Sequence, residues 1–260
     1  GLDDFARRAA ACHARGARFA KWRVTLPLGR AGAPPSERAV AENTWALARF
    51  AREAQEAGLL PIMQAVVSFE RGLHPFERTA IAQELVLTEL FAACRTNGVM
   101  LEGCLLQTSI TAPGAERYSS STLRNELWSA DQARLSAEPG AAAVAREALS
   151  ADAVNEVAKR ELLAVPKATV RTLQRTVPPS VPGILFTSGG LSEEEASFFL
   201  CEINKVPRLG AWNLAFSYSR ALQQTALRSY ASAAFADDEA RAGGTGERAM
   251  TPPPLFPTRS

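Results

Sequence analysis

The sequence predicts an α/β fold in which short β-strands alternate with longer helices. Five apolar, β-favouring runs are separated by segments with helical periodicity, and Gly, Pro or Asn residues mark many of the boundaries. Strands that alternate with helices favour a parallel sheet covered by those helices. The chain has 260 residues, 47% of them hydrophobic and 22% charged, which is enough for a sizeable buried core.

Residues 1–106 carry three helix–strand pairs. The helices are recognised by apolar residues at helical spacing and by their end signals: Ser36 is a suitable N-cap, and Gly58 and Gly98 are suitable terminators. The strands are recognised by short runs of β-favouring residues. The predicted elements are, in order, helix 1–18, strand 19–28, helix 36–58, strand 59–69, helix 75–94 and strand 99–106.

The rest of the chain contains a long helical segment, two more strands and a tail. Residues 119–173 are rich in Ala, Glu and Arg, and we expect two amphipathic helices there, separated by Glu138, Pro139 and Gly140. An apolar helix face of this kind needs the parent domain or a partner to cover it. Strands are predicted over 184–187 and 212–217, and the Gly/Pro-rich residues 237–260 are predicted to form an extended tail.

Composition excludes several functional classes. The net charge is +2 and the sequence has no block of basic residues, so composition gives no evidence of a nucleic-acid-binding surface. The sequence also contains no apolar run of about 18 residues, so no membrane-spanning helix is predicted. Cys12, Cys94, Cys104 and Cys201 form no CxxC pair and have no spacing that suits a zinc site, so no metal is expected. No other cofactor is expected either. Cys104 and Cys201 lie in apolar runs and are predicted to be buried thiols of a reducing compartment.

Several motifs resemble the class I fructose-bisphosphate aldolases. They are FAKWR at 19–23, ENTWALARFA at 42–51, LLQTSITAPG at 105–114 and the long stretch QRTVPPSVPG to SYSRALQ beginning at Gln174. The resemblance covers roughly residues 1–118 and 174–232. It implies a partial (β/α)8 (TIM) barrel over residues 1–236, equivalent to barrel strands four to eight, with residues 119–173 as a helical insertion.

The resemblance also implies that the catalytic groups of the family are replaced. Its Schiff-base lysine corresponds to Gln107, and its two proton-transferring carboxylates correspond to Gln64 and Val66. A carboxamide cannot condense with a ketone, and neither Gln nor Val can move protons at neutral pH. Lys21 remains, and Glu102 is expected to be a half-buried acid that pairs with Lys21 or Arg23. No catalytic residue is therefore expected.

A phosphate site is the second implication of the resemblance. In the family a small-residue loop and an arginine hold a substrate phosphate, and the equivalent positions here are Ser188, Gly189, Gly190 and Arg220, with Ser219 in place of a glycine. Lys21 and Arg23 are two residues apart, so a strand would direct both side chains to the same face. An internal salt bridge is the alternative for this pair. His74 is expected to be solvated or locally hydrogen-bonded.

The leading hypothesis is an inactive aldolase relative that serves as a structural subunit of a larger assembly. The first three barrel strands have no counterpart in the sequence, and open parallel strands need covering, so we expect other protein subunits at the open barrel edge. One alternative is a residual aldolase that uses Lys21, and another is a non-catalytic binder of a sugar phosphate. The expected location is intracellular, in an organelle such as the mitochondrion or plastid or in the cytoplasm.

Overall fold

The computed structural model describes residues 2–29, 32–68, 74–114, 151–189, 193–219, 222–223 and 226–231. The chain divides into two compact units, Gly1–Ala221 and Leu222–Ser260. The first unit contains the sheet and the long helices, and the second contains a short helix over residues 226–231. The predicted tail, 237–260, lies outside the described residues.

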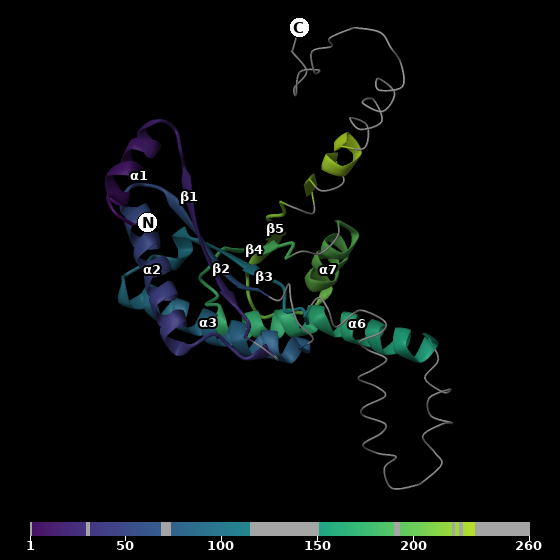
Figure 1. Cartoon of the computed structure of the whole chain (residues 1–260). Helices are drawn as coiled ribbons and strands as arrows, with labels where there is room; N and C mark the ends of the chain where they lie inside the picture. Colours follow the sequence, from purple (N-terminus) through teal and green to yellow (C-terminus); the bar gives the residue numbers. More distant parts are fainter. Residues whose placement is uncertain are drawn as a thin grey trace, which may run out of the picture. The chain divides into compact units, whose positions relative to one another are not determined.

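The first unit repeats strand and helix along the chain (Figure 1). Its sheet has five strands in the order β1-β2-β3-β4-β5, and every neighbouring pair is parallel. This agrees with the prediction of a parallel α/β fold and a partial TIM barrel. The elements are α1 (Phe5–Ala14), β1 (Phe19–Pro27), α2 (Glu37–Glu56), β2 (Leu60–Ser68), α3 (Phe76–Thr96), the 3₁₀ turn η2 (Leu101–Gly103), β3 (Leu105–Ser109), α6 (Ala151–Thr176), β4 (Gly183–Thr187), α7 (Glu193–Lys205) and β5 (Asn213–Phe216).

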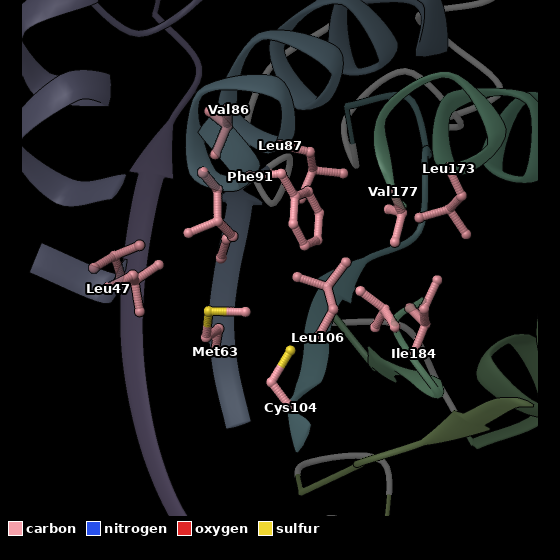
Figure 2. Packing of buried hydrophobic residues seen from close by; sticks show 14 of the residues in the cluster. Leu47, Met63, Val86, Leu87, Phe91, Cys104, Leu106, Leu173, Val177 and Ile184 are labelled. Carbon is pink, nitrogen blue, oxygen red and sulfur yellow. The ribbon is translucent and has the colours of Figure 1, made fainter. Parts of the chain in front are cut away.

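The two faces of the sheet differ in composition because side chains alternate along each strand. One face is apolar and packs under the helices: Met63, Leu106 and Ile184 are fully buried there. Figure 2 shows these side chains meeting Leu47 of α2, Leu87 and Phe91 of α3, and Leu173 of α6. The other face carries the polar residues of the same strands, including Lys21 and Gln107.

Local signals in the sequence explain where α2 begins and ends. The Ser36 hydroxyl accepts a hydrogen bond from the Ala39 backbone N–H at 3.3 Å, which caps the amino end of the helix. Gly58 follows the helix with φ of +75°, a conformation that costs glycine little. Two ion pairs between residues four apart, Arg49–Glu53 and Arg52–Glu56, lie along the second half of the helix.

A buried polar cluster joins α3 and α6 to the loop that follows β3. Gln83 accepts a hydrogen bond from the Thr111 hydroxyl at 2.6 Å, and its amide group donates to the Ser109 backbone oxygen at 2.8 Å. The Thr111 backbone N–H donates to Thr169 of α6 at 3.0 Å. Because these groups are buried and paired with one another, they fix the chain as it leaves β3.

The strand predicted over 99–106 is wrong in its position. Leu101–Gly103 forms a 3₁₀ turn, and the strand begins at Leu105 and extends to Ser109. Gln55 of α2 supplies the reason, because its amide group donates to the Met100 backbone oxygen at 2.7 Å and to the Gly103 backbone oxygen at 3.2 Å. Backbone groups bonded to a helix side chain are not available to a neighbouring strand. Glu102, expected to be half-buried, is exposed on this turn.

The expectations for Cys201 and His74 have different outcomes in the structure. Cys201 lies on the exposed side of α7 rather than in the core, whereas Cys104 is buried as predicted. His74 takes the second of its two expected states: it is 4% exposed, and its ring Nδ1 is locally hydrogen-bonded to the Pro75 backbone oxygen at 3.4 Å. Gly32 explains this burial, because an added Cβ there would lie 2.6 Å from the His74 Cβ, so the two loops touch.

The predicted helical segment 119–173 is described only from Ala151 onward. From there it is one continuous helix, α6, which ends at Thr176 and contains Pro166. Val165, Val170 and Leu173 of its second half are buried in the core. That half of the helix therefore belongs to the layer that covers the sheet.

Candidate functional site

A pocket of about 440 Å³ lies on the polar face of the sheet, toward the carboxyl ends of the strands. Carboxyl ends of parallel strands are where α/β proteins place their ligands, because the following loops converge there. Each of the strands β1 to β5 contributes lining residues to the pocket, either from the strand itself or from the loop that follows it. The lining residues are Lys21, Arg23, Gln64, Val66, Gln107, Thr187, Ser188, Gly189, Ser217, Tyr218 and Ser219.

The β1 side of the pocket is cationic. Lys21 and Arg23 both point into it, as their spacing on a strand predicts, and both side chains are exposed. The Arg23 side chain donates a hydrogen bond to the Thr25 hydroxyl at 3.0 Å. None of the described lining residues is acidic, and Glu102, the expected partner of this pair, is not among them. The pocket therefore favours a ligand with negative charge.

The centre of the pocket is neutral. Arg23 is in register with Gln64, and Gln64 is in register with Gln107 on the next strand. Gln64, Val66 and Gln107 are between 2% and 6% exposed, and none of them titrates in the physiological range. Lys21 provides the one primary amine among the described lining residues.

Two buried polar atoms of the pocket have no hydrogen-bond partner among the described residues: Gln107 Oε1 and Thr187 Oγ1. The Gln107 amide nitrogen donates to the Ser217 backbone oxygen across 3.5 Å, which is long for such a bond. Thr187 was not singled out from the sequence. A hydroxyl on the last residue of a parallel strand, beside the Ser188 loop, is the signal that could have found it.

Tyr218 borders the pocket but is already paired. Its hydroxyl donates a hydrogen bond to the Ala196 backbone oxygen of α7 at 2.7 Å, and burial raises its pKa from 10.0 to about 12. The phenol therefore keeps its proton at neutral pH and holds the loop after β5 against α7. Ser217 and Tyr218 are the other lining residues that sequence reasoning missed.

The predicted phosphate-binding residues are only partly described. Ser188 and Gly189 line the pocket, Ser188 being 5% exposed and Gly189 having φ of +57°. Ser219 also lines it. Gly190 and Arg220 lie outside the described residues. The structure thus brings Ser188, Gly189 and Ser219 to the same pocket as Lys21 and Arg23.

The described ranges contain no group of three or more His, Cys, Asp or Glu side chains arranged to hold a metal ion. Burial raises the pKa of the Cys94 and Cys104 thiols to about 12, so both stay protonated at neutral pH. Among the helices of the described ranges, none has the length and apolar character to cross a membrane.

The repeated strand–helix units with a carboxyl-end pocket define a protein of the barrel-type α/β class. The sequence profile of class-I fructose-bisphosphate aldolases matches residues 1–130 and 143–245. The chain therefore belongs to the class-I fructose-bisphosphate aldolase family, as the motifs predicted.

Individual relatives are similar over most of the chain. It is 37% identical over 230 residues to the cytoplasmic fructose-bisphosphate aldolase isozyme of Spinacia oleracea and 38% identical over 232 residues to the chloroplastic aldolase 3 of Arabidopsis thaliana. Each match covers 88% of this chain, but 52% and 47% of the respective relative. The chain thus spans about half the length of these relatives.

A solved structure supports the same relationship. The fructose-bisphosphate aldolase of Plasmodium falciparum, determined in complex with TRAP and a small-molecule inhibitor, superimposes with a TM-score of 0.67 at 36% sequence identity. The match covers 88% of this chain and 54% of the solved chain.

Proposed function

We propose that this chain is an aldolase-family subunit that forms no Schiff base and serves as a structural component of a larger assembly. The observation that carries the proposal is Gln107, which is buried at the centre of the pocket where the family motif leads us to expect the reactive lysine. A carboxamide nitrogen is not nucleophilic at neutral pH, so no covalent bond to a ketone forms at this position.

The neighbours of Gln107 support the same proposal. Gln64 and Val66 occupy the positions that we assign to the proton-transferring acids, and Tyr218 keeps its proton. General acid–base catalysis needs a group that titrates near the working pH. Restoring an amine at position 107 would therefore still leave the acids at positions 64 and 66 missing.

Borohydride trapping tests the proposal directly. The chain is incubated with dihydroxyacetone phosphate and sodium borohydride, and adducts are located by mass spectrometry. We expect no adduct on the native chain. The Gln107→Lys variant is the matched control, because a lysine at this buried position is expected to form a trappable imine. A stable adduct on the native chain would contradict the proposal.

Lys21 is the basis of an alternative, a residual aldolase, because it is the amine that lines the pocket in the described structure. The same trapping experiment decides between the two. An adduct that forms on the native chain and disappears in Lys21→Met would assign the chemistry to Lys21. Neither adduct nor turnover in the native chain would exclude this alternative.

The edges of the sheet are the basis for proposing protein partners. Within the described residues, β1 pairs only with β2 and β5 pairs only with β4. Unpaired edges expose backbone groups that soluble proteins cover. Phe19 at the start of β1 is 63% exposed and Phe216 at the end of β5 is 52% exposed. We propose that further strands, supplied by other protein subunits, pair with these edges.

Crosslinking tests this partner proposal. A photoreactive amino acid at position 19 should capture a polypeptide that pairs with β1, while the same group at Arg8, on the outside of α1, should not. A stable monomer of the isolated chain in sedimentation experiments would contradict it.

The relatives are cytoplasmic and chloroplastic proteins, which supports the proposal of an intracellular location.

A further inference from the structure

We infer that the pocket binds a hydroxylated anion non-covalently and selects a hydroxyl over a carbonyl through Gln107 and Thr187. This inference rests on the proposed function only in requiring that no Schiff base forms. Gln107 and Thr187 touch the ligand by hydrogen bonds in this proposal, and neither reacts with it.

The first step is the orientation of the Gln107 amide. Its nitrogen faces the Ser217 backbone oxygen at 3.5 Å, and the reverse orientation would place two acceptors against each other. The amide oxygen is therefore directed to a place where no protein group of the described structure donates to it. A buried acceptor without a donor costs free energy, so a bound group that can donate is favoured there.

The second step is the neighbouring Thr187 hydroxyl. Gln107 is in register with Leu185, and Thr187 follows Leu185 by two residues, so Gln107 and Thr187 lie on the same face of adjacent strands. They form no hydrogen bond with each other, because Thr187 Oγ1 is itself without a partner. A ligand group that reaches both atoms would satisfy them together.

The third step is the chemistry of that group. Gln107 Oε1 can only accept a hydrogen bond, whereas the Thr187 hydroxyl can donate one. A ligand hydroxyl can donate to Gln107 and accept from Thr187. A ketone oxygen can accept from Thr187 but leaves Gln107 Oε1 facing another acceptor. The pair is therefore complementary to an alcohol carbon and not to a carbonyl carbon.

The remaining lining residues define the rest of the ligand. Lys21 and Arg23 are positively charged and lie in the same pocket, so the ligand carries an anionic group. The volume of about 440 Å³ suits a small metabolite. The chemical class is thus a polyol that bears an anionic group, with a free hydroxyl near the sheet.

Calorimetry with two matched probes tests the inference on the full chain, purified alone or with the subunit that accompanies it. Glycerol 3-phosphate and dihydroxyacetone phosphate differ only in having an alcohol or a ketone at the middle carbon. We expect glycerol 3-phosphate to bind on the order of tenfold more tightly, because its hydroxyl adds one hydrogen bond and satisfies the Gln107 amide oxygen.

Variants separate selectivity from simple attraction to the cations. Gln107→Leu and Thr187→Val should each bring the affinity ratio of the two probes toward one, whereas Lys21→Met should weaken both probes equally. Thr172→Val is the matched control, because the Thr172 hydroxyl is also buried and unpartnered but does not line the pocket. It should leave the ratio unchanged.

Some outcomes would overturn the inference. These are equal affinity for the two probes, a preference for the ketone, no binding of either probe at millimolar concentration, or a ratio that survives both Gln107→Leu and Thr187→Val. An adduct trapped by borohydride is a separate result that contradicts the proposed function. Hydroxyl selectivity without an adduct supports both.

Discussion

Gln83 and Gln107 are both 2% exposed, yet their surroundings differ completely. Gln83 lies between α3 and the loop after β3, where its oxygen accepts from Thr111 and its nitrogen donates to Ser109. Gln107 lies at the pocket, where its nitrogen makes one long hydrogen bond and its oxygen has no hydrogen-bond partner in the part of the chain that the structure describes. A glutamine that holds the fold together is satisfied by the protein, whereas one that the described protein leaves unsatisfied is open to water or to a ligand.

The largest expected effect is the loss of the satisfied glutamine. Gln83→Leu removes a buried acceptor and donor and leaves the Thr111 hydroxyl and the Ser109 backbone oxygen without their partner. We expect the free energy of unfolding to fall by roughly 2–3 kcal/mol. Urea unfolding followed by circular dichroism measures this. A loss below about 0.5 kcal/mol, within the range of ordinary surface substitutions, would show that Gln83 does not stabilise the fold more than Gln107 does.

A pair of threonines repeats the comparison on a smaller scale. Thr111→Val removes the hydroxyl that donates to Gln83 at 2.6 Å, and we expect a loss of about 1–2 kcal/mol. Thr187→Val removes a hydroxyl without a partner and should change stability by less than about 0.5 kcal/mol in the absence of ligand. Equal losses in the two variants, measured by the same urea titration, would argue that Thr187 is already satisfied.

Gln107→Leu is expected to act in the opposite direction to Gln83→Leu. The substitution removes an unpartnered buried acceptor and gives up only a long contact to Ser217, so the free energy of unfolding should rise by up to about 1 kcal/mol. Thermal unfolding without ligand gives the measurement. Destabilisation comparable to that of Gln83→Leu would show that Gln107 is a structural residue.

The smallest effect concerns Tyr218, a pocket residue that does have a partner. Its pKa is raised from 10.0 to about 12 by burial, so the neutral phenol is favoured in the folded state. Its contribution to stability is therefore complete below pH 10 and is lost as the pH rises toward about 12. We expect Tyr218→Phe to flatten the decline of stability in that window. Tyr230→Phe, at an exposed residue, should leave the decline unchanged.

Most of the fold could be predicted from the sequence because its signals are local. The Ser36 cap and the glycines with positive φ fix helix ends, and alternation along β1 places Lys21 and Arg23 on one face. The exceptions depend on distant contacts. Gln55, 45 residues before Met100, converts the start of a predicted strand into a turn, and no local pattern around Met100 contains that information.

The candidate site was predicted less completely, for a related reason. The motifs pointed to Lys21, Arg23, Gln64, Gln107 and Ser188, and the structure brings these together. Thr187 was missed because its relevance arises from the register between β3 and β4, which places it on the same face as Gln107, two residues beyond Leu185, the register partner of Gln107. The absence of a hydrogen-bond partner is likewise a property of the assembled structure, since any glutamine in a sequence could find one.

Trp212 gives the last strand an optical label. Its ring is 3% exposed, and its indole N–H donates to the Pro178 backbone oxygen at 2.9 Å, which ties the residue before β5 to the loop before β4. A buried indole emits at shorter wavelengths than one in water. In a variant whose other three tryptophans, Trp22, Trp45 and Trp128, are replaced by phenylalanine, detachment of β5 would therefore shift the fluorescence to the red while the far-ultraviolet signal of the helices persists. Loosening of this edge can thus be followed in real time without adding a dye.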